Sequence, residues 1–330
     1  TDTFALIKCL DGPIIKAELN EVVIKLERKI PLMLAFLKSM GGALKEPPLW
    51  GDTALDMMYP FEDLEKYVNQ WIPLSEIELQ EKVILSQSGF VVHRNPQYHF
   101  IFKTSDFGPA YQPGHSHCDA LAFTLHVEGE PVFVDSGLAN YRNTSVRRYA
   151  RCTTAHNTVF INGLEQAECW HAFRMARRIS TSPPDIKQGE KAFSVTGCYS
   201  HNWGPSSKRY QHSRTITFFD GYWLIVDEIT GGEKLEAHSR FHLHPDYKVN
   251  IRHEFLELSN GKQNLFFVYK GARIRFSLKH GHYYYNYDKD WQNIVIELSS
   301  SVAQKIKMSY VISLPEKWKD AQKLVADLNL

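Results

Sequence analysis

The sequence has no excess of charge of either sign and no long apolar run. Its 38 lysines and arginines against 37 aspartates and glutamates leave a formal charge of +1, which argues against a nucleic-acid-binding surface or a charge-repelled disordered chain. No segment approaches the ~18 apolar residues of a membrane span. We therefore expect neither nucleic acid nor a membrane as partner, and any attraction for a charged molecule must be local.

Cysteine is scarce as well. The five cysteines are odd in number, widely spaced and without a CxxC pair, which argues against a disulfide framework or a thiolate zinc site. Internal repeats and Gly/Ser-rich linkers are also missing. A chain of 330 residues can bury about three quarters of its unfolded surface, so it needs no crosslink merely to fold.

The first 80 residues have a helical pattern. From Glu18 to Met40, apolar residues recur at three- and four-residue steps, which predicts a helix with one buried stripe, kinked at Pro31 and ended by the pair Gly41-Gly42. Shorter helical stretches follow at 52–58 and 62–71. We predict that residues 1–80 form a helical segment that docks on the rest of the chain.

After residue 80 the pattern changes to short runs of β-branched and aromatic residues, several with a two-residue period. Turn dipeptides such as NG, DG and KG separate the runs. Many short strands with no helical segment between them predict a large antiparallel β-sandwich over residues 81–330. The predicted fold class is therefore mainly β, with an N-terminal α piece.

The segments GHSHCDALAF, PVFVDSG and TTAHNTVFING hold the densest set of chemically capable side chains. In an extended segment, His115 and His117 would face one groove, because side chains two residues apart share a face. Two imidazoles and a carboxylate are a ligand set that zinc accepts. His117, Asp135 and His156 would supply three ligands and leave a fourth position open. The alternative is that these are separate histidines with ordinary packing roles.

The predicted hairpin FTLHVEGEPVFVD restricts this set. If the chain turns at its GE pair, Asp135 pairs near Thr124, which is more than ~20 Å from His117 along a straight strand. The segment 113–119 must therefore curl back as a loop, or the metal set is wrong. Gly114, beside a proline, permits such a bend.

Arginine is concentrated between Tyr141 and Ser180. Seven arginines and two glutamates give this stretch a local balance of +5. Arginine suits bidentate recognition of carboxylate or sulfate, so an acidic polymer or sugar is a natural partner; a solvated basic edge strand is the alternative. The arginines are Arg142, Arg147, Arg148, Arg151, Arg174, Arg177 and Arg178.

Taken in order, GHSHCDALAF, VDSG, RxxRxxTAHNTV and INGxEQ resemble the heparinase II/III-like family of polysaccharide lyases, which includes heparin, heparan sulfate and alginate lyases. RTITFFDGYWLIVDEITG and PPLWGDTALDM are similar to further family segments, so the resemblance extends from about residue 47 to about residue 232. It implies the end of an α/α toroid followed by a C-terminal β-sandwich, with substrate in the cleft between them. It also implies a periplasmic or secreted enzyme.

The resemblance implies roles for single residues. It makes His115 a catalytic histidine and His117 and Asp135 zinc ligands, with His156 preferred to His171 as the third ligand. The family's other catalytic groups, a tyrosine and a histidine or asparagine, lie in the toroid and have no counterpart that we identify in this chain. This departure leaves open whether the chain by itself is active.

Such lyases remove a weakly acidic proton beside a uronate carboxylate, so that carboxylate must be neutralised. Arg148, Arg151 and Asn157 are the predicted substrate-binding residues for this task. Histidine can act as the acid or the base near neutral pH, which suits His115 to one of the two roles.

Two other interpretations remain open. A cupin-like metal enzyme also carries an HxH pair, but Ala120 and Leu121 stand where its glutamate is expected. Alternatively, the sandwich is a non-catalytic module that binds an acidic glycan through the arginines and through aromatics such as Trp170, Tyr199 and Trp203. The sequence does not specify the uronate polymer or the oligomeric state.

Overall fold

The computed structural model describes residues 13–42, 44–105, 107–108, 111–232, 234–302 and 304–328, so the first twelve residues of the predicted helical segment lie outside the described part. None of the helices in the described ranges combines the length and apolar character that crossing a bilayer requires. The α-helices are α2 (Pro13–Leu37), α3 (Phe61–Asn69), α4 (Ser145–Arg151) and α5 (Trp318–Asp327).

Helix α2 continues through Pro31, which therefore does not end it. A π-helical turn at Lys38–Gly42 follows, and Gly41 there has φ 92°, a conformation that glycine adopts without steric cost. The helix thus ends close to the glycine pair, as its sequence predicts. Ile30 and Leu34 of α2 pack with Phe61 and Val68 of α3 to form a small separate core.

The strands form antiparallel sheets. A five-stranded sheet has the order β1 (Lys82–Leu85), β2 (Phe90–Arg94), β3 (Tyr98–Lys103), β4 (Phe123–Val127), β5 (Glu130–Phe133). An eight-stranded sheet has the order β14 (Lys248–Ile251), β15 (Leu256–Ser259), β16 (Asn264–Gly271), β19 (Lys305–Ser313), β12 (Tyr222–Thr230), β11 (Tyr210–Phe218), β10 (Phe193–His201), β9 (Asp185–Gln188). A four-stranded sheet has the order β17 (Arg275–Tyr283), β18 (Trp291–Val302), β13 (Leu235–His242), β6 (Val159–Ile161), and β7 (Ala167–Trp170) pairs with β8 (Arg174–Arg178).

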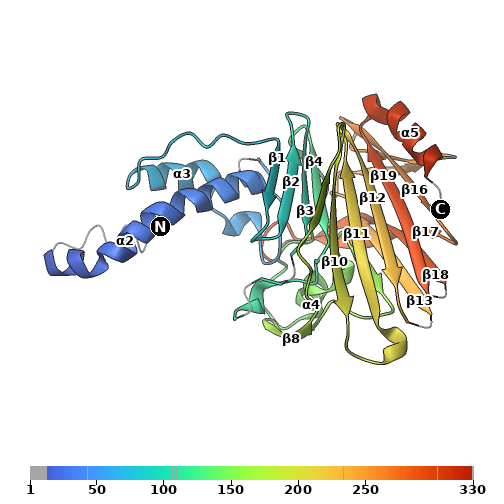
Figure 1. Cartoon of the computed structure of the whole chain (residues 1–330), viewed down its shortest axis with the longest axis horizontal. Coiled ribbons are helices and arrows are strands. Elements are labelled where there is room, and N and C mark those ends of the chain that lie inside the picture. Colours follow the sequence, from blue (N-terminus) through green and yellow to red (C-terminus); the bar gives the residue numbers. More distant parts are fainter. Residues whose placement is uncertain are drawn as a thin grey trace.

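The sheets stack in two layers, which confirms the predicted sandwich. Phe100 of β3 packs on Trp223 of β12, with ring centroids 5.5 Å apart, and Phe241 of β13 packs on Tyr310 of β19 at 4.8 Å. The five- and four-stranded sheets therefore cover the same face of the eight-stranded sheet. A bridge between Phe133 and Leu243 joins these two covering sheets edge to edge. In Figure 1, α2 and α3 project from one end of the sandwich and α5 lies at the other.

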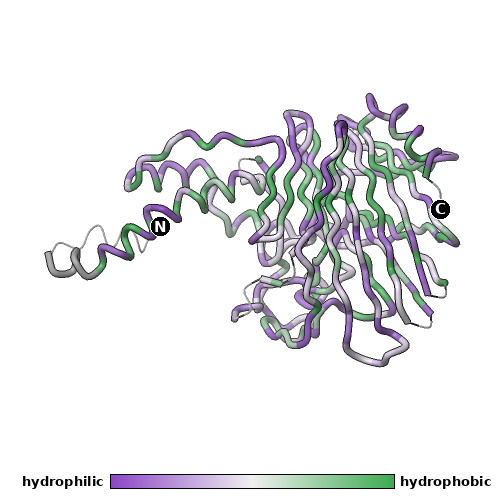
Figure 2. The backbone as a smooth tube through the Cα atoms, in the orientation of Figure 1, coloured by the Kyte–Doolittle hydropathy of each residue, from purple (hydrophilic) through white to green (hydrophobic). Residues whose placement is uncertain are grey.

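Side chains along the central strands of the eight-stranded sheet alternate between buried and more exposed positions, as expected for a sheet with one face on the core. Along β10 and β11, every second side chain is buried and the others are partly exposed or exposed. Figure 2 shows hydrophobic and hydrophilic stretches interspersed along the strands of the sandwich. The inward residues form one continuous core, in which Trp223 is fully buried.

The segment 44–58, between α2 and α3, is fastened to the sandwich. The side chain of Tyr283 donates a hydrogen bond to the Glu46 carboxylate, and Leu49 packs against Tyr283 and Val134. The backbone N–H of Leu138 donates to the carbonyl of Thr53 over 2.9 Å. These contacts bring residues around position 52 onto the surface formed by the loops of the sandwich.

Two buried histidines strengthen this attachment and make it sensitive to pH. His99 donates through Nε2 to the carbonyl of Ser39 at 3.0 Å, and His126 donates through Nε2 to the carbonyl of Glu46 at 2.9 Å. Burial lowers the pKa of His99 to about 3 and that of His126 to about 4. Both rings are therefore neutral in the folded protein throughout the mildly acidic range.

We expect the free energy of unfolding to fall as the pH drops below about 6.5, where the histidines of the unfolded chain take up protons and the buried ones do not. Each of the two histidines should lower the free energy of unfolding by about 2 kcal/mol at pH 5. The His126→Gln variant keeps an amide N–H for the carbonyl of Glu46 but has no group that titrates there. The free energy of unfolding of this variant should therefore fall by about 2 kcal/mol less than that of the wild type between pH 7.5 and pH 5. Urea unfolding at both pH values measures this, and an unchanged pH dependence would contradict it.

Candidate functional site

A loop between β3 and β4 presents His115 and His117. The described residues of this loop contain a 3₁₀ turn at Pro113–His115 and no strand, so the chain curls back as the hairpin geometry required. The turn of the following hairpin lies at Glu128 and Gly129, both with positive φ, one residue before the predicted Gly129-Glu130 turn, and Asp135 comes just after β5. The predicted turn position is therefore wrong by one residue, and the chain before β4 curls back as a loop as expected.

Polar side chains hold this loop from four directions. Arg151 donates to the carbonyl of Ser116, and Gln166 bonds both the N–H and the carbonyl of Ala120. The other two fixing side chains are Lys103, which pairs with Asp119, and Arg214, which donates to the carbonyl of Leu121. A loop fixed at so many points presents its histidines in one geometry.

His117, Asp135 and His156 come together in the buried interior, each with one potential ligand atom within 4.8 Å of the others. The Nδ1 of His156 lies 2.8 Å from a carboxylate oxygen of Asp135. The three come from the loop before β4, the residues just after β5 and the turn after α4, so three distant segments meet here, and their role as metal ligands stays a prediction.

The unused nitrogens of this cluster fit a metal ion. Nδ1 of His117 and Nε2 of His156 are buried and have no hydrogen-bond partner in the described part of the chain. Because a carboxylate accepts hydrogen bonds, the contact from Nε2 of His117 to Asp52 at 2.9 Å puts the proton on Nε2 and leaves a lone pair on Nδ1. A ligating histidine in a zinc site usually makes such a contact to a carboxylate.

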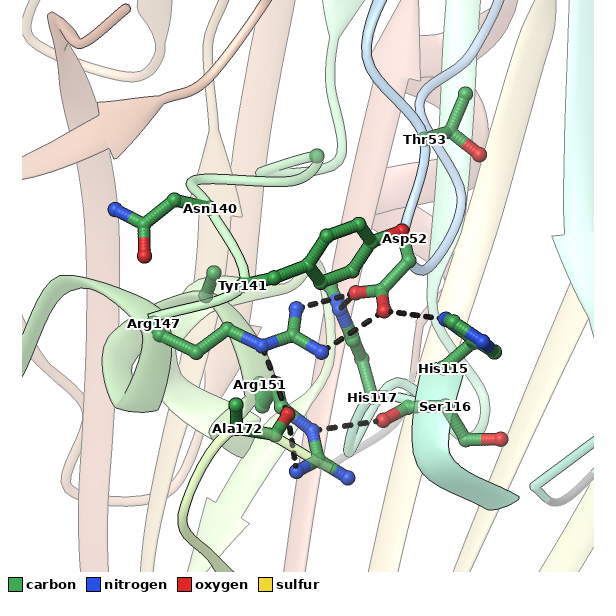
Figure 3. A network of polar contacts seen from close by, with 12 residues as sticks. Asp52, Thr53, His115, Ser116, His117, Asn140, Tyr141, Arg147, Arg151 and Ala172 are labelled. Carbon is green, nitrogen blue, oxygen red and sulfur yellow. Dashed lines mark hydrogen bonds and ion pairs between the residues drawn. The ribbon is translucent and has the colours of Figure 1, made fainter. Parts of the chain in front are cut away.

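Asp52 is the central residue of the site, and the sequence analysis assigned it no role. Its carboxylate accepts hydrogen bonds from Nδ1 of His115 at 2.9 Å, from Nε2 of His117 at 2.9 Å and from both Nη atoms of Arg147. Figure 3 shows it between the guanidinium of Arg147 and the ring of His115. One carboxylate thus connects the predicted catalytic histidine to a predicted metal ligand.

The charge of Asp52 is secured by these partners. Burial by itself would raise the pKa of Asp52, but hydrogen bonds from His117 and Arg147 outweigh it and hold the pKa well below the usual range. The Arg147 and Asp52 side chains are 0% and 2% exposed, so their charges are compensated within the protein. Nearby, burial lowers the pKa of His117, whereas Asp135 outweighs burial and raises that of His156.

His115 differs from the rest of the network because its side chain is 53% exposed. Its ring lies edge-on to Tyr141 and Phe173, with centroids 5.9 and 5.7 Å away. It also lines a cleft of about 540 Å³. Since Nδ1 donates to Asp52, Nε2 is the ring nitrogen that remains for proton transfer.

The three predicted substrate-binding residues have different placements. Arg148 is exposed on α4. Arg151 is 1% exposed and donates to the carbonyls of Ser116, Ala172 and Arg174. Its position does not support direct contact with substrate, because its guanidinium group is buried and already hydrogen-bonded to these three backbone carbonyls.

Asn157 is 1% exposed, and its placement also argues against substrate binding. Its amide donates to the carbonyls of Phe123 and Val134 and accepts from the N–H of His242. The amide therefore joins strands of the covering layer. Tyr199, named above as a glycan-binding aromatic, is buried too and hydrogen-bonded to Gln166, which removes it from that role.

A buried ion pair lies behind the cluster. Arg214 and Asp227 face each other on β11 and β12, are 0% exposed and make two hydrogen bonds of 2.8 Å. Arg214 also donates to the carbonyl of Asn157, the residue next to His156, at 2.6 Å. This pair therefore positions the two segments that carry His117 and His156.

Comparison with known proteins agrees with the fold and with the family resemblance. The model of the family "Heparinase II/III-like, C-terminal" matches residues 80–311. The chain belongs to this heparinase II/III-like family. The comparison with curated proteins returned no match.

Solved structures of lyases have the same fold. A structure of heparinase III is 16% identical with a TM-score of 0.68, covering 90% of this chain and 50% of its own. Heparan sulfate lyase HepC from Pedobacter heparinus is 15% identical with a TM-score of 0.64, covering 85% and 46%. This heparinase II/III-like chain thus spans about half the length of these structures, and at such identity the likeness shows the fold alone.

Proposed function

We propose that the chain is the sandwich part of a polysaccharide lyase that cleaves an acidic, uronate-containing glycan by β-elimination. The observation that carries this proposal is the exposed His115, whose Nδ1 is bonded to a buried, ionised Asp52 at the edge of a cleft. Asp52 fixes the tautomer of His115, and Nε2 is then free to move a proton at the substrate. Membership of the heparinase II/III-like family supports this choice of reaction class.

In this reaction the proton beside the uronate carboxylate is removed and the bond to the neighbouring sugar breaks. His115 acts as one member of the acid–base pair, and we assign the other to a group outside this chain. Arg148, exposed on α4, is the remaining candidate among the predicted residues for pairing with the substrate carboxylate. Asp52 and Arg147 hold His115 in place and do not contact substrate themselves, because both are buried.

Zinc is the metal that the cluster fits, with His117, Asp135 and His156 as ligands. When bound, zinc would supply positive charge and fix the loop that carries His115. The periplasmic or secreted location implied by the resemblance belongs to this proposal as well.

In a protein that holds both this chain and the second acid–base group, replacement of His115 by alanine should abolish formation of the unsaturated uronate product, with a rate loss of at least about a hundredfold, since a positioned acid–base group contributes that much. The assay measures ultraviolet absorbance with heparan sulfate, alginate and other uronate polymers. His253→Ala, at an exposed histidine in the turn between β14 and β15, is the control and should retain activity. Unchanged turnover in His115→Ala would remove His115 from the mechanism.

The same assay separates cleavage from binding. A non-catalytic acidic-glycan-binding module is the second candidate, with the exposed side chains of Arg148 and Trp170 among its predicted binding residues. Ultraviolet-absorbing product identifies a lyase, and glycan binding without product identifies the module.

Removal of a proposed zinc ligand should release metal and lower thermal stability together, because the metal binds the folded state. We expect this of His117→Ala and Asp135→Ala in elemental analysis and thermal unfolding. His171→Ala is the matched control, because His171 is exposed and lies outside the cluster. Protein prepared without chelator that carries no zinc would assign the three residues a packing role.

A further inference from the structure

Two cysteine side chains meet beside the loop that precedes β4. The Sγ atom of Cys118, the residue after His117, lies 4.0 Å from the Sγ atom of Cys169 on β7. The two residues are 51 positions apart in the sequence, so their contact joins this loop to the hairpin of β7 and β8. The sulfurs of a disulfide bond are about 2 Å apart, and the two thiols would therefore have to approach each other by only about 2 Å.

The backbone around Cys169 permits this approach. The pairing register of β7 with β8 shifts between Ala167 and Cys169, and an irregularity of this kind interrupts the ladder and redirects side chains. The backbone of Cys118 is held more firmly, because its N–H donates to the carbonyl of Arg151 over 3.0 Å. We therefore expect the Cys169 side to move toward Cys118 when the two sulfurs bond.

The two thiols differ in access to solvent. Cys118 is 0% exposed and belongs to the core of the sandwich, whereas Cys169 is partly exposed and precedes Trp170, which is 44% exposed. A hydrogen bond from Cys118 lowers the pKa of the Cys169 thiol, and the charge of Arg151 acts in the same direction against burial. The thiolate is the form of cysteine that attacks a disulfide. Cys169 is therefore the thiol that an oxidant reaches first.

We propose that Cys118 and Cys169 form a disulfide bond when the chain meets a small-molecule disulfide such as oxidised glutathione. The Cys169 thiolate attacks one sulfur of the oxidant, forms a mixed disulfide and expels one glutathione thiolate. The sulfur of Cys118 then attacks the sulfur of Cys169, and the second glutathione leaves with the proton of Cys118. The chain gives up two electrons, and the oxidant takes them up as two thiols. This inference does not depend on the proposed lyase function.

The bond fixes the hairpin of β7 and β8 against the loop that carries His115. Arg151 already bridges the same two segments, since it donates to the carbonyls of Ser116 and Ala172. Phe173, between β7 and β8, packs edge-on against the ring of His115. A covalent link makes this arrangement permanent and restricts the unfolded chain, which stabilises the folded state. It is a single crosslink rather than the disulfide framework that the sequence argues against, because it uses two of the five cysteines.

Peptide mapping of the folded chain tests the bond. The reduced chain is incubated with oxidised glutathione, its remaining thiols are blocked in denaturant, and trypsin and a glutamate-specific protease cut it. Glu165 and Glu168 lie between Cys152 and Cys169, so this digestion places the two cysteines on different fragments. We expect the fragments of Cys118 and Cys169 to be joined, with a mass two hydrogen atoms below the sum of the reduced fragments.

Thermal unfolding tests whether the bond fits the fold. The midpoint of the oxidised chain should lie about 5 °C above that of the reduced chain, and Cys169→Ser should remove both the crosslink and this shift. Cys198→Ser is the matched control, at a partly exposed cysteine of β10, and should keep both. Free thiols at Cys118 and Cys169 in the oxidised wild type, a lasting glutathione adduct on Cys169, or an oxidised midpoint no higher than the reduced one would each overturn the proposal.

Discussion

Replacing Asp52 by alanine is expected to lower the free energy of unfolding by about 3–5 kcal/mol, the usual cost of leaving one partner of a buried ion pair alone. The cost arises at Arg147, which is 0% exposed and would lose both of its Nη contacts to the carboxylate. Its Nε contact to the carbonyl of Ala172 at 3.0 Å remains but does not compensate the charge. Urea unfolding of both proteins measures the difference.

The same substitution should disturb the site in a second, separable way. Without Asp52, neither His115 nor His117 has a fixed ring orientation, and zinc affinity should fall by about 10- to 100-fold, as it does when the carboxylate behind a ligating histidine is lost. Competition with a zinc-binding dye measures this in the folded protein. Asp52→Asn offers one oxygen acceptor in the same volume and should recover part of the histidine orientation but not the charge compensation.

Glu168→Ala is the matched control for Asp52→Ala. Glu168 forms the same forked contact with Arg177, through Nε at 3.1 Å and Nη2 at 2.6 Å, but on the exposed hairpin of β7 and β8. Solvent screens that pair, so its loss should leave the unfolding midpoint almost unchanged. Equal midpoints for Asp52→Ala and the wild type would show that Asp52 is not the residue that balances Arg147.

The sequence was sufficient for the sandwich because its strands follow a short-range rule, whereas the three-residue cluster was proposed from its residue types and from the family resemblance, and its role as a metal site stays a prediction. Alternation of side chains predicts the strands, and the length of the hairpin before Asp135 requires the loop that brings His117 back. Family membership and fold class were confirmed for the same reason, since ordered motifs survive as local patterns. Asp52 was not predicted, because it lies 63 residues before His115 and 95 before Arg147, and no periodicity connects those positions.

Polar residues within a motif were harder to interpret than the motif itself. Arg151 and Asn157 have side chains that suit a substrate carboxylate, but both donate their hydrogen bonds to backbone carbonyls inside the fold. The sequence does not distinguish an arginine that fixes a loop from one that binds a ligand, because both uses need the same forked donor. The segment PPLWGDTALDM, which contains Asp52, was recognised in the sequence, but the position of Asp52 in the structure depends on how the helical segment docks on the sandwich.

The ion pair behind the cluster did have a readable signal. In the strand that contains RTITFF, Arg214 shares its face with Ile216 and Phe218, and the facing strand places Asp227 on the same side. Charged residues at inward positions of two adjacent strands predict a buried pair, since neither can be buried alone. Burial would raise the pKa of Asp227, but the Arg214 charge outweighs it and holds the pKa far below its usual range.

We expect Arg214→Met and Asp227→Leu each to lower the free energy of unfolding by about 3–5 kcal/mol, because each leaves one buried charge without its partner. The double variant removes both charges and should be more stable than the sum of the two losses predicts, by about 1–3 kcal/mol. A double-mutant cycle in urea measures this coupling, and additive losses would contradict it.

Recovered stability in the double variant should not restore the site. Arg214 is also the donor to the carbonyls of Leu121 and Asn157, which neither methionine nor leucine replaces. Those two residues adjoin the segments that carry His117 and His156, so zinc affinity should stay low in the double variant even where folding recovers. A double variant that regains both stability and zinc affinity would limit the pair to a packing role. If stability recovers and zinc affinity does not, Arg214 is the residue that connects the core of the sandwich to its site.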